Sequence, residues 1–246
     1  MKINHSKLLN NFAGLMHAFT TKQSANLAFH VNDVPENVKS SHKELAKLLS
    51  YDIETLVHMK QIHSNLVHVV TEDDNFENPP TCDALITNKI NTPLMVMVAD
   101  CSPILFYDDV QKVIAVAHAG RAGAFTNIIS NVIDSLTKEF HSEIQNIFVS
   151  IGPAIGNCCY EVGAEIYDEA KALGVEYAIQ KENERYYLDI RSILKTQLLE
   201  SGIIEENIEI SEICNCCQHE KYFSYRHNKV TGRFAGVIKL NECLHS

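Results

Sequence analysis

VADCSPILFYDDVQKVIAVAHAGRAGAF, residues 98–125, contains two apolar runs that border on reactive side chains. ILFYD (104–108) and KVIAVAH (112–118) are too short for helices and are bounded by proline or charge, so both predict strands. Cys101 and His118 each lie at the polar end of a run. Because reactive groups commonly sit in loops at strand ends, held by a rigid sheet, these two residues are the first site candidates.

Regular elements are expected on both sides of this stretch. LMVMVAD (94–100) predicts a strand just before it, and an apolar stripe at helical spacing predicts a helix over 126–140. NIFVSIGPAIG (146–156) predicts a strand that breaks at Gly152 and Pro153, which would complete a strand–helix–strand crossover. The remaining predicted elements are helices at 35–50, 163–173 and 190–201, a strand at 65–70, and two strands joined by a polar turn within 221–240.

The order of these elements indicates the fold class. Strand runs cluster and do not alternate strictly with helices, which favours α+β with mixed β-sheets packed between helices. A chain of 246 residues that is 46% hydrophobic can bury one large core. We therefore expect a single domain over residues 1–246.

Composition excludes several classes of function. The formal charge of −10 argues against a nucleic-acid partner. No run of eighteen apolar residues occurs and the first residues lack a secretory signal, so we expect a cytoplasmic protein without a membrane partner. The eight cysteines are then hydrophobes, ligands or nucleophiles, not a disulfide framework. The sequence indicates no oligomeric state.

Cys101 and His118 admit two functional interpretations. Either His118 activates a Cys101 thiolate as a nucleophile, or both bind a metal together with a third ligand. The alternative without function is a buried, hydrogen-bonded pair. His63 is the best third ligand, because Gln61, His63 and Ser64 form a polar interruption between apolar stretches. The neighbouring His58 and His68 are expected on a solvated or hydrogen-bonded face.

Two histidines and one thiolate suit zinc, with the fourth tetrahedral position left open for water or substrate. Copper would also bind tightly. A multicopper oxidase, however, needs many closely grouped histidines, and no His-x-His pair occurs in the chain. Zinc is therefore the expected cofactor, copper is less favoured, and the histidine pattern argues against a laccase.

AGRAG (119–123) follows His118 and is expected to open a helix at about residue 125. Gly120 and Gly123 allow close backbone approach, and Arg121 beside helix-start N–H groups would form an anion site that suits phosphate. The alternative is a tight strand-to-helix turn with a solvated arginine.

Two further cysteine groups occur later in the chain. Cys158 and Cys159 are adjacent, which does not favour chelation of one ion, so we expect them to be buried by packing. Cys214 and Cys217 have a Cys-x-x-Cys spacing, but no second such pair completes a zinc ribbon, so structural zinc is a minor alternative.

The chain resembles the YfiH-type family at QIHS (61–64), CDALIT (82–87), ADCSPILFYD (99–108), AVAHAGRAG (115–123), IGPAIGNCCYEVG (151–163) and FSYRHNKVTGRFAGVI (223–238). That family was formerly labelled a multicopper polyphenol oxidase (laccase) domain and is now described as zinc-containing purine nucleoside phosphorylases. The resemblance implies a fold similar to that of toxin-type cysteine hydrolases. Its zinc ligands correspond to His63, Cys101 and His118.

The resemblance also implies an activity: phosphorolysis of adenosine, inosine and methylthioadenosine, with adenosine deamination in addition. The expected partners are therefore a purine nucleoside and phosphate. A peptidoglycan-precursor editing role and a Cys–His thiol hydrolase are the alternatives. The chain departs from the family after Thr20-Thr21, where Lys22 and a glycine-free loop replace the usual arginine and glycine-rich loop.

Roles can be assigned to the candidate residues as hypotheses. Arg121, with Gly120 and Gly123, is expected to bind phosphate, with Lys22 as a weaker candidate. Gln61 and Ser64 are candidates for substrate contacts. Asp83 and Asp100 are possible proton carriers, or structural acceptors near turns.

Overall fold

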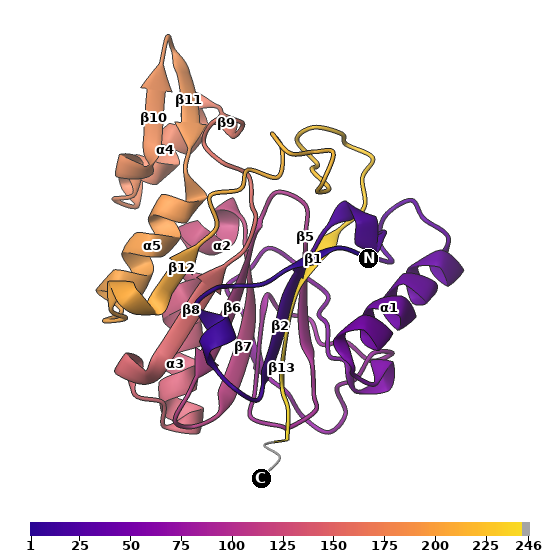
Figure 1. The fold of residues 1–246 in the computed structure, drawn as a ribbon. Helices are drawn as coiled ribbons and strands as arrows, with labels where there is room; N and C mark the ends of the chain where they lie inside the picture. The colour runs from indigo at the N-terminus through magenta and orange to yellow at the C-terminus, as the bar shows by residue number, and fades with distance from the viewer. Residues whose placement is uncertain (243–246) are drawn as a thin grey trace.

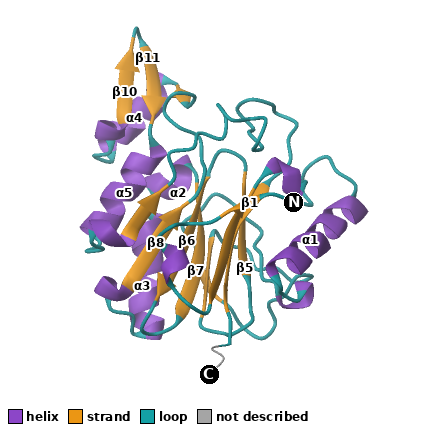
Figure 2. Ribbon diagram, in the orientation of Figure 1, coloured by secondary structure: helices purple, strands orange, loops and turns teal. Residues whose placement is uncertain are grey.

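Two β-sheets pack face to face and carry helices on their outer faces (Figures 1 and 2). The structure is a computed structural model, and it describes residues 1–242. The larger sheet has six strands in the order β12 (Ile208–Ile210), β8 (Ile147–Ile151), β6 (Ser102–Asp108), β7 (Val113–Ala119), β4 (Ala84–Thr87) and β3 (Val67–Val69). The smaller has four, in the order β1 (Ile3–Asn4), β2 (Leu15–Thr20), β13 (Phe234–Leu240) and β5 (Leu94–Val98).

Side-chain alternation explains why β6 is buried on both faces. Ile104 and Phe106 contact the helix layer, whereas Leu105 and Tyr107 point into the core between the two sheets. Successive side chains of a strand point to opposite faces, so a strand buried on both reads as a continuous apolar run. This accounts for the uninterrupted ILFY sequence.

Within residues 1–242, four α-helices cover the two packed sheets. On the outer face of the six-stranded sheet lie α2 (Arg121–Phe125), α3 (Ile128–Phe140) and α5 (Ile190–Glu200), and α1 (Pro35–Leu49) covers the four-stranded sheet. The apolar stripe of α3 is buried there, which leaves its polar face to solvent. Helix α4 (Ala164–Ala172) packs near a small sheet of β9 (Glu161–Val162), β10 (Ile179–Glu182) and β11 (Arg185–Leu188), which projects beyond α5 (Figure 1).

The predicted α+β class with mixed sheets between helices is confirmed. The predicted crossover is also present, since β7 and β8 are both antiparallel to β6 and are joined through α2 and α3. Within residues 1–242, no helix is both long enough and apolar enough to cross a membrane.

One expectation about an individual element was wrong. The segment 221–240 contains one strand, β13, and not two. Its first half turns back instead, because Ser224 and Arg226 donate hydrogen bonds to Asp100 and not to a neighbouring strand. The helix expected over 126–140 is present as α3, capped by Asn127, and the separate short helix α2 that precedes it was not predicted.

A candidate metal centre at the ends of β4, β6 and β7

Strand register places Asp83, Cys101 and His118 on one face at one end of the six-stranded sheet. Pro103 of β6 pairs with His118 of β7, so Cys101, two residues before Pro103, lies on the same face as His118. On the other side of β7, Ala84 pairs with Ala117. Asp83 therefore lies beside His118, and the His118 amide donates to the Asp83 carbonyl at 2.8 Å.

His63 completes a cluster of three metal-binding side chains. One ligand atom each from His63, Cys101 and His118 lies within 4.8 Å of the other two. The imidazoles of His63 and His118 meet edge to face, with 4.8 Å between their ring centroids. The three residues that the sequence singled out are thus brought together, from a loop before β3 and from the ends of β6 and β7.

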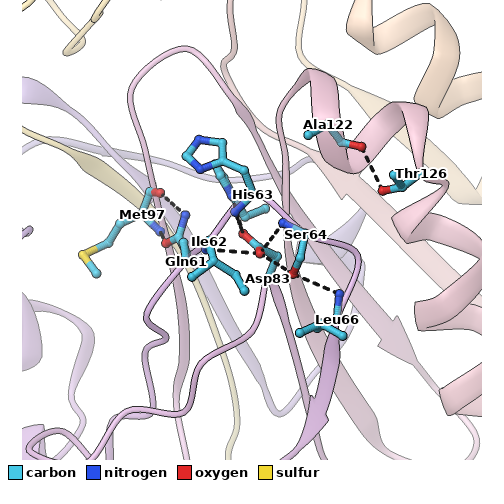
Figure 3. Close-up of polar contacts among 10 residues, drawn as sticks. Gln61, Ile62, His63, Ser64, Leu66, Asp83, Met97, Ala122 and Thr126 are labelled. Atoms are coloured by element: carbon cyan, nitrogen blue, oxygen red, sulfur yellow. Dashed lines mark hydrogen bonds and ion pairs between the residues drawn. The ribbon is translucent and has the colours of Figure 1, made fainter.

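The loop that carries His63 is held by a single carboxylate (Figure 3). Asp83 accepts hydrogen bonds from the backbone amides of Ile62, His63 and Ser64, at 3.2, 3.1 and 2.6 Å, and from the Ser64 hydroxyl at 2.7 Å. These bonds hold His63 at a positive φ of 60°, which is uncommon for a residue other than glycine. The His63 ring points away from Asp83 (Figure 3).

Electrostatics favour a thiolate at Cys101. Burial raises the pKa of its thiol, but His118 and then His63 outweigh this effect and lower it to about 6. Burial lowers the pKa of His118, while Cys101 and Asp83 raise it to about 9. Without a metal, the pair is therefore a thiolate and an imidazolium near neutral pH.

Asp83 is ionised and orients His118. Burial raises its pKa, and hydrogen bonds from His118 and Ser64 lower it to about 2. Its Oδ1 lies 2.8 Å from His118 Nδ1, which leaves Nε2 for the cluster. A carboxylate that holds the second nitrogen of a histidine is the usual outer partner of a metal-binding imidazole.

Asp100 holds the segment before Cys101 in place. Its backbone has a positive φ of 94°. Its carboxylate accepts from the Asn215 side chain at 2.9 Å, from Ser224 Oγ at 2.7 Å and from the Arg226 amide at 2.6 Å. Of the two roles considered for Asp100, these contacts support the structural acceptor.

The cluster lies in the wall of a cavity of about 540 Å³. Gln61 also lines it, with its side chain fixed by a pair of hydrogen bonds to the Met97 backbone, at 2.7 and 2.9 Å (Figure 3). Sequence reasoning missed several lining residues: His30, Tyr160, Tyr225, Arg226, Lys229 and Arg233. A signal for three of them was available, since RHNKVTGR (226–233) concentrates basic residues in an acidic chain.

The two glycines after β7 pack closely against the site, Gly120 more tightly than Gly123. A Cβ on Gly120 would lie 2.7 Å from Cys101 Sγ, and one on Gly123 would lie 3.2 Å from the His118 carbonyl oxygen. Arg121 lines the cavity and forms an ion pair with Glu169 of α4. Gly120 is in the cavity wall as well.

Two other candidates lie elsewhere. Lys22 is not among the cavity-lining residues; its ammonium donates to the His219 carbonyl at 3.3 Å and lies over the Phe223 ring. The Ser64 hydroxyl is bound to Asp83 and does not line the cavity. His58 and His68, which were expected on a solvated or hydrogen-bonded face, bond to the Phe76 carbonyl and to Asp74.

The donor set fits a metal ion. Two imidazoles and a thiolate are within reach of one another, the carboxylate of Asp83 fixes one imidazole, and the cavity borders the cluster on its open side. Three protein ligands with one open position are the arrangement of catalytic zinc. The same donors also occur in copper sites.

Sequence comparison assigns the family. The family model described as multi-copper polyphenol oxidoreductase laccase matches residues 14–241. The chain belongs to this family. The resemblance to YfiH-type proteins is thereby confirmed.

Members of the family share both sequence and fold with this chain. Purine nucleoside phosphorylase YlmD of Bacillus subtilis is 30% identical over 91% of this chain and 88% of its own. A purine nucleoside phosphorylase of Corynebacterium glutamicum is 36% identical over 88% of this chain and 87% of its own. The crystal structure of YlmD from Geobacillus stearothermophilus superposes with a TM-score of 0.89 at 28% identity, covering 96% of this chain and 94% of its own.

Proposed function

We propose that this protein is a zinc-dependent purine nucleoside phosphorylase acting on adenosine, inosine and methylthioadenosine. The observation that carries the proposal is the combination of a His63–Cys101–His118 ligand set with cationic side chains in one cavity. The names of the relatives, purine nucleoside phosphorylases at 30–36% identity, support phosphorolysis of a purine nucleoside.

The cavity is lined by basic side chains that suit phosphate better than the ligands expected from the sequence. Arg226, Lys229 and Arg233 line the cavity, and none of them forms an ion pair with a carboxylate in the described part of the chain. Arg121 is already paired with Glu169. Cations without an acidic partner attract anions, and arginine matches phosphate geometry. Arg233 and Lys229 are therefore the first candidates, with Arg121 in support.

A nucleoside has room beside the phosphate. A second cavity, of about 590 Å³, shares His30, Gln61 and Met97 with the first, and Phe29 and Phe76 contribute aromatic surface. Purine bases bind apolar and aromatic walls with a few polar contacts. Burial, Arg233 and His63 lower the pKa of His30, so it is neutral near pH 7 and can donate a hydrogen bond to the base.

The residues divide the work of phosphorolysis. The reaction separates base and ribose through an oxocarbenium-like transition state, so phosphate must be held in line with the sugar. His63, Cys101 and His118 would hold zinc, which when bound supplies Lewis acidity to the cavity. Asp83 fixes the His118 tautomer, and the Gln61 amide, held by Met97, presents a rigid polar wall.

The family description as a laccase does not supply a better function. Among residues 1–242, the groups of three or more metal-binding side chains are His63–Cys101–His118 and a set of cysteines. A multicopper oxidase needs several histidine-rich copper sites close together, and these groups do not provide them.

A second candidate function follows from one contact. Without a metal, the lowered pKa of the half-buried Cys101 and the raised pKa of the buried His118 favour a thiolate–imidazolium pair, which is the arrangement of a thiol hydrolase. This function competes with the phosphorylase, because zinc coordination would occupy the thiolate that the hydrolase needs as a free nucleophile.

Chromatography of adenosine reactions tests the proposal. Zinc-loaded protein with phosphate should release adenine and ribose 1-phosphate, and omission of phosphate should abolish adenine release. Inosine formed from adenosine without phosphate would establish the additional deaminase activity. Chelator-treated and copper-loaded protein, and the variant His118→Ala, serve as controls. Absence of nucleoside turnover by the zinc-loaded protein would refute the proposal.

A further inference from the structure

Two loops that leave the same edge of the six-stranded sheet bring four cysteines together. Cys158 and Cys159 follow β8, and Cys214 and Cys217 follow β12. β8 and β12 are parallel neighbours, so their chains leave the sheet at the same end. A further bridge between Ala154 and Cys214 extends the pairing into the loops.

The four sulfurs form a group of the right size for one ion. Cys217 Sγ lies 3.5 Å from Cys158 Sγ and 3.3 Å from Cys159 Sγ. The sulfurs of Cys158 and Cys159 are 3.9 Å apart. All four lie within 4.8 Å of one another. A tetrahedral zinc with Zn–S bonds of about 2.3 Å has sulfurs about 3.8 Å apart. These separations far exceed the ~2.05 Å of a disulfide bond.

We propose that Cys158, Cys159, Cys214 and Cys217 bind a structural zinc ion, at a second site distinct from the His63–Cys101–His118 centre. Four thiolates and no open position are typical of structural zinc. This corrects the expectation that Cys158 and Cys159 pack in the interior, since Cys158 is exposed. Adjacent cysteines did not suggest a shared ion, but this loop aims both sulfurs at Cys217.

Backbone amides surround the sulfur of Cys214 as they would a metal-bound thiolate. The amides of Gly156 and Cys217 donate to Cys214 Sγ at 3.2 and 3.5 Å. Such donors stabilise the negative charge of metal-bound sulfur. Gly156 lies between the cluster and Arg191, because a Cβ on it would lie 2.6 Å from Arg191 Nη2 and 3.2 Å from Cys158 Sγ. The Arg191 guanidinium therefore lies beside the cluster, where it offsets the net negative charge of four thiolates around a dication.

The ion would tie together two parts of the cavity wall. Asn215, between two of the ligands, donates to Asp100, the residue before Cys101. Arg226 lines the cavity and donates to the Cys159 carbonyl at 2.9 Å. Zinc at the cysteines would thus fix the position of Arg226 and of the Asp100–Cys101 segment without contacting substrate. This inference does not depend on the proposed function.

Metal analysis of full-length protein tests the site without an activity readout. The variant His63→Ala/His118→Ala lacks two ligands of the first centre and should still carry about one zinc per chain. Adding Cys214→Ser and Cys217→Ser to it should remove this zinc. Cys216→Ser is the matched control, because Cys216 lies between the two ligands but outside the four-sulfur group, and it should retain the ion.

Cobalt(II) provides a second measurement that needs no cysteine substitution. The His63→Ala/His118→Ala variant reconstituted with cobalt(II) should show the intense visible bands of a tetrahedral tetrathiolate site. An octahedral cobalt(II) spectrum from the His63→Ala/His118→Ala variant would overturn the proposal. Retention of zinc after Cys214→Ser and Cys217→Ser are added would overturn it as well. Loss of zinc from Cys216→Ser would also overturn the ligand assignment.

Discussion

Asp83 Oδ1 lies 2.8 Å from His118 Nδ1, and the same carboxylate accepts hydrogen bonds from three backbone amides of the loop that carries His63. One side chain therefore positions two of the three candidate metal ligands. Carboxylates of this kind are outside the metal's own ligand set but control its affinity. Four consequences of the structure can be measured.

Asp83→Asn should lower zinc affinity at the His63–Cys101–His118 centre and phosphorolysis by roughly 10- to 100-fold, because His118 loses its fixed tautomer. Competition with a chelating dye measures the affinity. Asp74→Asn is the matched control, since Asp74 likewise bonds to a histidine, His68, and neither residue lines the cavity beside the metal ligands. Equal losses in both variants would show that the effect is general destabilisation.

The Cys101 thiol should react as a thiolate in metal-free protein. Its pKa of about 6 means that the rate of alkylation rises as pH increases through about 6, whereas an ordinary cysteine requires about 8.5. Mass spectrometry of iodoacetamide-treated protein measures the rate, with Cys101→Ser to identify the site. Bound zinc should protect the thiol. Rapid alkylation of fully zinc-loaded protein would favour the thiol hydrolase instead.

Arg233→Gln should raise the KM for phosphate by about 10- to 100-fold, which corresponds to the loss of a charge-assisted hydrogen bond of about 1.5–3 kcal/mol. The KM for nucleoside should change much less. Arg121→Gln should have a smaller effect on phosphate, because its guanidinium is paired with Glu169. Steady-state kinetics with each substrate varied separately distinguish the two arginines. A larger increase in the KM for phosphate in Arg121→Gln than in Arg233→Gln would instead identify Arg121 as the main phosphate ligand.

Gly120→Ala should abolish activity while the fold remains, because the new Cβ would lie 2.7 Å from Cys101 Sγ and displace it. Zinc binding at this centre should weaken in parallel. Gly123→Ala, with its nearest contact at 3.2 Å, should be milder. Circular dichroism and zinc content of the two variants provide the comparison. An active Gly120→Ala protein would show that Cys101 tolerates displacement.

The sequence predicted the parts of the fold that depend on local pattern. Continuous apolar runs identified β5, β6, β7 and β8, and helical stripes identified α1 and α3. The sequence could not predict that β4 pairs with β7, which is the pairing that places Asp83 beside His118. Asp83 and Asp100 therefore remained equivalent candidates. Strand pairing is set by contacts between distant segments, which periodicity does not record.

For the same reason, the sequence could not predict which basic side chains reach the cavity or which cysteines lie together. Arg226 and Arg233 reach the cavity only because residues 221–233 turn back to Asp100. Cys159 and Cys217 meet only because β8 and β12 are neighbours. His63 and Cys101 could be selected in advance because polar interruptions beside apolar runs are visible locally.

The position of β13 has a consequence for biosynthesis. This strand lies between β2 and β5 in the four-stranded sheet, although residues 15–20 and 94–98 leave the ribosome long before residues 234–240. Until then, β2 and β5 each lack β13 as a partner and leave one strand edge unpaired. We therefore expect the nascent chain to be prone to edge-to-edge association until residues 234–240 emerge, and removal of β13 should leave no partly folded, active fragment.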